Sequence, residues 1–203
     1  MMSRENIEPW IQTWSGGKFD LIDPTPKMID IMDIAKSLSK QCRFNGHTTS
    51  FYSVAQHSVE LLKYHLSENE EEYEIIRKGD ADVYGFLQKA MTVLLHDASE
   101  AYIGDMTSPL KTLMPEFKEP ENKIDAVIAT KFNTIYPHPP WLKTLDTRIL
   151  LDERVSVMTH TLEDWKLDVE PLGIHITPWP VGKAYSGFIN YFYHLDYLFG
   201  LQT

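Results

Sequence analysis

The stretch YGFLQKAMTVLLHD, from Tyr84 to Asp97, decides how this chain folds. It predicts a helix over residues 82–96 with apolar side chains on nearly every side, and a helix of that kind lies buried among other elements. We therefore expect this helix at the centre of the molecule. It would also deliver the polar pair His96-Asp97 at the end of a core element.

Further helical patterns lie on both sides of this stretch. Asp30 can cap a helix that begins at Ile31, and Pro120 suits the first turn of another. Near the N-terminus, two short strands flank the glycine turn Gly16-Gly17. The expected fold is all-α, a helical bundle with a small N-terminal β-hairpin. We expect strands at 10–14 and 18–21, and helices near 31–38, 52–66, 82–96, 120–133, 141–162 and 184–198.

Length and composition suit one domain with a sizeable core. The chain has 203 residues, of which 43% are hydrophobic, and a domain of that size buries most of its apolar surface. We find no internal repeat and no linker long enough to separate domains. The expected organisation is a hairpin extension at 1–28, a helical core at 30–165, and a C-terminal segment and helix at 166–203.

The charge balance and the single cysteine narrow the range of functions. With 19 basic and 29 acidic residues the formal net charge is −10, which argues against a protein that tracks nucleic-acid phosphates. A small phosphorylated molecule is still compatible, because a metal ion and a few cations can reverse the field locally. Cys42 cannot form an intrachain disulfide, and we find no membrane or targeting segment. We expect a cytoplasmic protein with no membrane partner.

Four residues are candidate metal ligands: His57, His96, Asp97 and Asp146. Each is predicted on or at the end of a helix, where a bundle can bring them together. Asp146 falls inside an apolar helical stripe, and a buried carboxylate without a partner is costly. Imidazole and carboxylate donors without thiolate suit a divalent cation with open coordination positions, which favours a catalytic over a structural site.

Each of these residues also has a purely structural interpretation. His57 is compatible with a hydrogen-bonded histidine at a helix border. The sequence Asp97-Ala98-Ser99-Glu100 has the form of a helix capping box, and Asp105 stands where a turn favours aspartate. Asp146 could pair with Arg43 instead of a metal ion. Taken together, four ligand-type residues at predicted inward positions favour the metal site.

Longer strings around the ligands resemble a known family. The order His57, His96-Asp97, Asp146 is similar to the H…HD…D signature of HD-domain metal-dependent phosphohydrolases. The strings RFNGHT at 43–48, YSVAQHSV at 52–59 and LLHDASEAYIGD at 94–105 resemble those of bacterial and phage 5′-deoxynucleotidases and related phage dATP triphosphohydrolases. The resemblance covers about residues 30–160. It departs at Arg43-Phe44, where the deoxynucleotidases have arginine-tryptophan.

The resemblance implies a role for each matched position. A divalent cation (Mn, Co, Mg, Zn or Fe) would be held by the four ligands, while Glu100 and Asp105 would handle protons during hydrolysis. Arg43 and Lys111 are candidates to neutralise phosphate charge. Phe44 would pack on the sugar or base. Trp14 could do the same, but a position in the hydrophobic core is the favoured interpretation of that residue. His47 is a pocket candidate because its loop precedes a ligand helix.

The implied function is an enzyme of nucleotide metabolism that cleaves the 5′ phosphoester of deoxynucleotides, releasing phosphate from a dNMP. A dNTP triphosphohydrolase that releases triphosphate is the alternative, and a nucleotide-sensing domain without turnover is a further one. A small deoxynucleotide, not a polymeric nucleic acid, is the expected partner. Aromatic-rich helical sequence such as 188–199 also predicts a homodimer or higher homo-oligomer.

Overall fold

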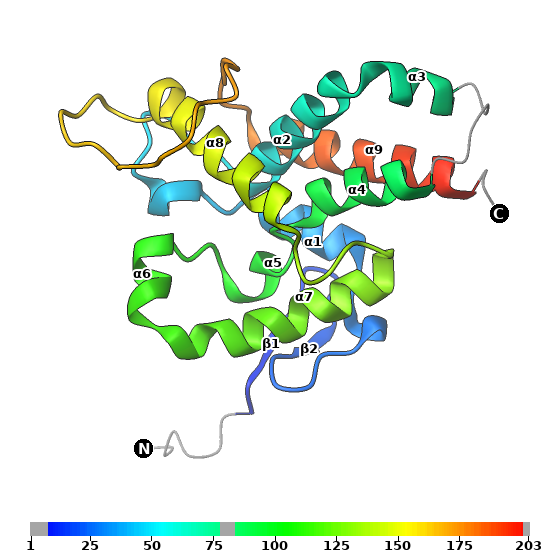
Figure 1. Cartoon of the computed structure of the whole chain (residues 1–203). Coiled ribbons are helices and arrows are strands. Elements are labelled where there is room, and N and C mark those ends of the chain that lie inside the picture. The colour runs from blue at the N-terminus through cyan, green and yellow to red at the C-terminus, as the bar shows by residue number, and fades with distance from the viewer. Residues whose placement is uncertain (1–7, 78–83, 201–203) are drawn as a thin grey trace, which may run out of the picture.

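The computed structural model describes residues 8–77 and 84–200, and the chain is mostly helical there (Figure 1). Strands β1 (Trp10–Gln12) and β2 (Lys18–Asp20) pair antiparallel, with Ile11 opposite Phe19. The predicted N-terminal hairpin is therefore confirmed. Residues 1–7 of the predicted extension and residues 82–83 of the predicted central helix lie outside the described residues.

Most of the remaining described chain is helix. Short 3₁₀ turns are η2 (Pro26–Met28), η3 (Arg43–Gly46) and η4 (Pro115–Phe117). The α-helices are α1 (Ile31–Leu38), α2 (Val54–Glu68), α3 (Glu70–Arg77), α4 (Tyr84–Leu95), α5 (Glu100–Ile103), α6 (Ser108–Leu113), α7 (Lys118–Phe132), α8 (Pro140–Val157) and α9 (Val181–Gly200).

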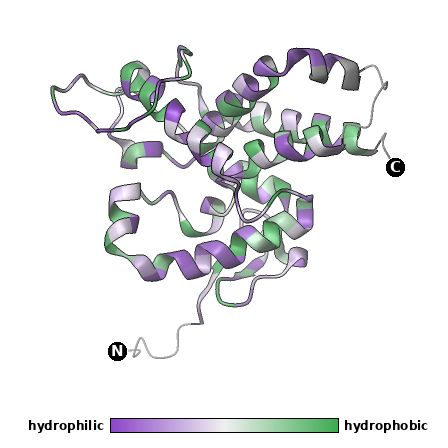
Figure 2. Cartoon of the chain, in the orientation of Figure 1, coloured by the Kyte–Doolittle hydropathy of each residue, from purple (hydrophilic) through white to green (hydrophobic). Residues whose placement is uncertain are grey.

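Helix α4 occupies the core, as its sequence predicts. It packs against α2 and α9, which also pack against each other, and its residues Leu87, Val93 and Leu94 are fully buried. Helix α9 contributes the buried Phe188 and Leu195, so the C-terminal helix is part of the same core. Hydrophobic and hydrophilic residues are interleaved along the surrounding helices (Figure 2), as expected where each helix buries one side.

The predicted cap of α1 is confirmed, and α2 has a similar cap that was not predicted. The Asp30 carboxylate accepts the Met32 N–H at 2.7 Å, and the Ser53 hydroxyl accepts the Gln56 N–H at 3.2 Å. Helix α8 ends at Val157, not near residue 162 as expected. Two threonines in the residues that follow have weak helix propensity, and the chain continues to Pro180 without a helix or strand.

No helix within residues 8–77 and 84–200 is long and apolar enough to cross a membrane.

Candidate functional site

The four predicted ligands converge. His57 lies on α2, His96 and Asp97 directly follow α4, and Asp146 lies on α8. The His57 and His96 Nε2 atoms are 3.3 Å apart. Asp97 Oδ2 lies 3.6 Å from His57 Nε2 and 3.3 Å from His96 Nε2. Asp146 Oδ1 lies 3.2 Å and 3.8 Å from the same two nitrogens.

These separations fit donor atoms arranged around one divalent cation. Bonds of about 2.0–2.2 Å to nitrogen and oxygen put neighbouring donors roughly 3–3.6 Å apart. His57, His96 and Asp97 form a group that could hold a metal ion, and Asp146 adds a fourth donor beside it. The set contains imidazole and carboxylate only, which suits a borderline or hard divalent cation.

Both histidines are held with Nε2 toward the cluster. His57 Nδ1 lies 2.6 Å from Glu153 Oε1, and His96 Nδ1 lies 2.8 Å from the Val93 carbonyl oxygen. Each acceptor favours the tautomer with the proton on Nδ1, which leaves the unprotonated Nε2 able to bind a metal ion. A carboxylate or carbonyl behind the imidazole is the usual support of a metal-ligating histidine.

Glu153, which supports His57, also binds two other residues near the site. Its side chain is fully buried and accepts from the Tyr52 hydroxyl at 2.8 Å and from Arg43 Nη2 at 3.2 Å. Burial alone would raise the pKa of Glu153, but Arg43 and His57 outweigh it and lower the pKa. Sequence reasoning missed this residue. Its signal is the spacing of seven residues from Asp146, two turns along the same face of α8.

The structure also settles two of the alternative interpretations. Arg43 contacts Asp97 at 3.4 Å and Glu153 at 3.2 Å, while Asp146 lies beside the two histidines. The start of α5 has no side-chain cap, so the capping-box reading of Asp97 and Glu100 is wrong. Glu100 is instead 5% exposed, and its Oε2 is a buried atom with no hydrogen-bond partner within residues 8–77 and 84–200.

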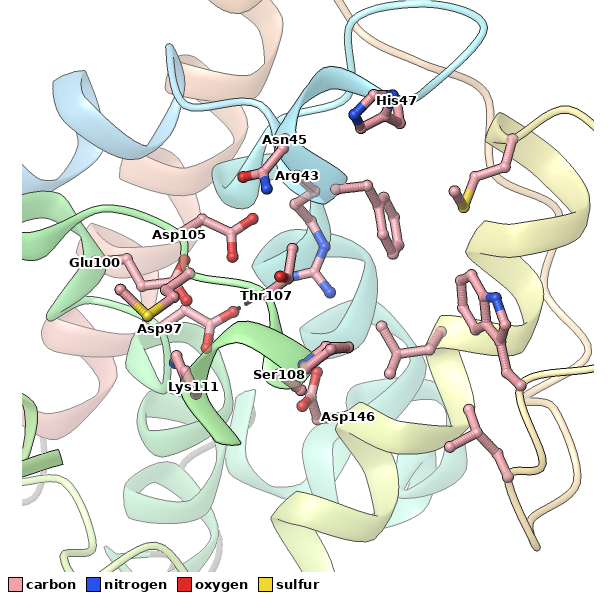
Figure 3. Close-up of a pocket in the computed structure, with 17 residues that line it drawn as sticks. Arg43, Asn45, His47, Asp97, Glu100, Asp105, Thr107, Ser108, Lys111 and Asp146 are labelled. Carbon is pink, nitrogen blue, oxygen red and sulfur yellow. Dashed lines mark hydrogen bonds and ion pairs between the residues drawn. The ribbon is translucent and has the colours of Figure 1, made fainter. Parts of the chain in front are cut away.

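A pocket of about 640 Å³ opens beside Asp97 and Asp146 (Figure 3). This volume is within the range of roughly 300–1,000 Å³ of small-molecule sites. In Figure 3, Glu100 and Asp105 lie on the same side of the pocket as Asp97, with which Arg43 is paired. The lining residues are Arg43, Phe44, Asn45, His47, Asp97, Glu100, Asp105, Met106, Thr107, Ser108, Pro109, Lys111, Asp146, Leu150, Met158, Trp165 and Leu167.

The turn η3 has an unusual backbone where it meets this pocket. Phe44 and Asn45 have left-handed conformations with φ of 54° and 52°, followed by Gly46 at 77°. For a residue with a side chain this conformation costs about 1–2 kcal/mol, and such strain often occurs where a side chain must be aimed at a ligand. The turn is held by the hydrogen bond from the Arg43 N–H to the Tyr52 carbonyl at 2.9 Å.

Four of the predicted substrate residues line the pocket, and Trp14 does not. Phe44 and His47 line it with Arg43 and Lys111. Arg43 is buried between two carboxylates, and Lys111 Nζ lies 2.6 Å from Glu121 Oε1. Trp14 is 58% exposed and does not line the pocket, so neither the core nor the pocket interpretation of that residue holds.

Acidic side chains outnumber basic ones around the pocket. Four carboxylates line it, from Asp97, Glu100, Asp105 and Asp146, against the cations of Arg43 and Lys111. Burial and the Asp97 and Asp105 carboxylates raise the pKa of Glu100 well above its ordinary value. Burial is also the main reason that the pKa of Asp105 is raised. An anionic ligand would need more positive charge here than the side chains supply, which a divalent cation would add.

Comparisons with known proteins give relatives without an assigned function. No protein-family model matches the chain. It is 36% identical over 196 residues to the uncharacterized protein YfdR of Escherichia coli K12, covering 93% of this chain and 97% of YfdR. An uncharacterized protein of Rhodobacter capsulatus is 33% identical over 135 residues, which span 64% of this chain and 62% of that protein. The chain belongs to the same family as YfdR.

Proposed function

We propose that this protein is a divalent-metal-dependent HD-domain phosphohydrolase that cleaves the 5′ phosphoester of deoxynucleoside monophosphates. The observation that carries the proposal is the convergence of His57, His96, Asp97 and Asp146 beside a pocket. When bound there, a divalent ion supplies Lewis acidity, which lowers the pKa of water and polarises a phosphoryl oxygen.

The protein's own side chains divide the remaining tasks. Arg43 is held by Asp97 and Glu153 with its guanidinium at the pocket, so it can orient a phosphate without first being ordered. Glu100 offers an unpartnered carboxyl oxygen beside Asp97, which suits transfer of a proton from water or to the leaving 5′ oxygen. Asp105 lines the same part of the pocket and supports this role.

The cations at the pocket favour a monophosphate. Among the described residues that line it, Arg43 and Lys111 are the only lysine or arginine, and Lys111 is already paired with Glu121. Beside one divalent ion, these two side chains match the smaller charge of a monophosphate better than that of a triphosphate. The deoxyribose preference rests on the resemblance, in which the element matching Arg43-Phe44 lies against the sugar and leaves little space for a 2′-hydroxyl.

A hydrolysis screen tests the proposal. Purified protein would be incubated with Mn²⁺, Co²⁺ or Mg²⁺ and each of the four dNMPs, the four dNTPs and the corresponding ribonucleotides, and the products identified. We expect phosphate from dNMPs, a lower kcat/KM for ribonucleotides, and no product with a chelator. An Asp97→Asn preparation controls for contaminating phosphatases. Triphosphate from dNTPs would support the alternative activity, and no turnover of any nucleotide would reject the enzyme.

A further inference from the structure

Trp165 lines the pocket and has no role in the proposed metal-dependent hydrolysis. It lies between α8 and α9, where residues 158–180 form no helix or strand. Trp165 lines the pocket together with Leu150, Met158 and Leu167. Every lining residue after Asp146 is apolar, whereas the carboxylates come from residues 97–105 and from Asp146 itself. The pocket therefore has a charged side and an apolar side.

Two aromatic rings meet on the apolar side. The Phe44 and Trp165 ring centroids are 6.0 Å apart with an angle of 38° between the planes, so the rings form a corner instead of a closed stack. The guanidinium carbon of Arg43 lies 5.5 Å from the Phe44 ring centroid. That of Arg154, on α8, lies 5.0 Å from the Trp165 centroid. Each ring is thus held in place by a cation.

Arg154 also ties the backbone before Trp165 to α8. Its guanidinium donates a hydrogen bond to the Glu163 carbonyl oxygen. Lys166, next to Trp165, has a left-handed backbone with φ of 52°, and its N–H donates to the Asp164 carboxylate at 3.0 Å, which forms a tight local turn. These contacts hold a half-buried tryptophan at the pocket although no regular element carries it.

We propose that Trp165 is the face on which the nucleobase of the substrate packs. This inference rests on the proposed function, because it takes the phosphate to lie by the ligand cluster and the sugar by Phe44. The base would then extend toward the apolar side. Tryptophan offers the largest π face of any side chain, and every base has a π face of its own. The contact would therefore favour substrates that carry a base, without distinguishing one base from another by hydrogen bonds to its edge.

The test compares two phosphoesters that differ only in the base: dAMP and 2-deoxyribose 5-phosphate. For Trp165→Ala we expect kcat/KM for dAMP to fall roughly 5- to 150-fold, the loss typical of removing one base–aromatic stack, while 2-deoxyribose 5-phosphate changes less than about 2-fold. Trp165→Phe should restore most of the dAMP activity. Leu162→Ala, at a 96% exposed position in the same segment, is the matched control and should leave both substrates unaffected. Equal losses on both substrates, or no loss on dAMP, would overturn the inference.

A binding measurement separates this inference from the proposed function. Deoxyadenosine, which has a base but no phosphate, should quench tryptophan fluorescence of the wild type, and Trp165→Phe should lose that quenching. If quenching depends on Trp165 but no nucleotide is hydrolysed, the base face stands and the hydrolase proposal fails. If dAMP is hydrolysed and neither measurement depends on Trp165, the base-face inference alone is wrong.

Discussion

The ligand cluster (His57, His96, Asp97 and Asp146) and the pocket wall (Phe44, His47, Glu100, Asp105, Lys111 and Trp165) are built differently. In the cluster the donor atoms contact one another, and both histidines are backed by a further acceptor. In the wall, Glu100 has a buried oxygen without a partner, and Trp165 lies on an irregular segment. The donor atoms of the cluster are held in place by neighbouring groups, whereas the wall leaves groups available to contact a substrate.

The largest expected effect on turnover is at the wall. Glu100→Gln removes an ionisable group whose Oε2 has no hydrogen-bond partner among the described residues. We expect kcat to fall about 10²- to 10⁴-fold, as for the loss of a general acid or base. Metal content and melting temperature should remain near wild type, because Glu100 is not a ligand in this proposal. A variant that melts early and still turns over substrate would show that Glu100 has a structural role instead.

A smaller effect, on metal affinity, is expected from a change to Glu153, which supports the ligand His57. Glu153→Gln weakens the acceptor that orients His57, so affinity for Mn²⁺ should fall about 10- to 100-fold, as is typical when the support of a ligating histidine is altered. The variant should also be less stable, because Arg43 and Tyr52 lose a buried charged partner.

Asp152→Asn is the matched control for Glu153→Gln. The neighbouring Asp152 carboxylate accepts the backbone N–H groups of residues 172, 173 and 174 at 2.7–3.0 Å and does not contact a ligand in the described structure. It should lower the melting temperature and leave Mn²⁺ affinity unchanged. Equal affinity losses in the two variants would mean that Glu153 acts only through stability.

The smallest expected effect concerns the pH dependence of stability, and it comes from a second, partly buried histidine on α2 that is not a proposed metal ligand. His65, eight residues after His57 on α2, stacks between Phe86 and Trp141 at centroid distances of 5.9 Å. Burial, and secondarily Lys89, lowers the pKa of His65 below its ordinary value of 6.5. The unfolded chain therefore binds a proton first as the pH falls, and stability decreases from about pH 6.5 downward.

His65→Phe should keep the stacking and remove this part of the pH dependence. The free energy of unfolding, measured from pH 8 to pH 5 on both proteins, should decline less in the variant. The contributions of the other histidines cancel in the difference between the two proteins. Parallel curves would contradict the prediction that His65 causes part of the loss of stability at low pH.

The sequence predicted the cluster better than the wall, for a physical reason. The four ligands lie on or next to helices whose periodicity places them inward, and Asp30 caps α1 by local chemistry, as predicted. Glu153 could have been found from its spacing to Asp146 on α8. Trp165 could not, because an irregular segment has no periodicity and its position depends on Arg154 and Phe44, which are distant contacts. The end of α8 and the six-residue helix α6 were not predicted either, because a helix end and so short a helix give too little periodic pattern to detect.

Titration of Mn²⁺ into chelator-treated protein tests the proposed metal centre most directly. Wild type and Trp165→Ala should each bind one ion per chain with similar affinity, because the wall does not hold the metal. Asp97→Asn should lose more than about 100-fold in affinity, since a ligand contributes more than the groups behind it, and activity should fall with it. Absence of stoichiometric binding in the wild type, or unchanged affinity in Asp97→Asn, would contradict a metal held by His57, His96, Asp97 and Asp146.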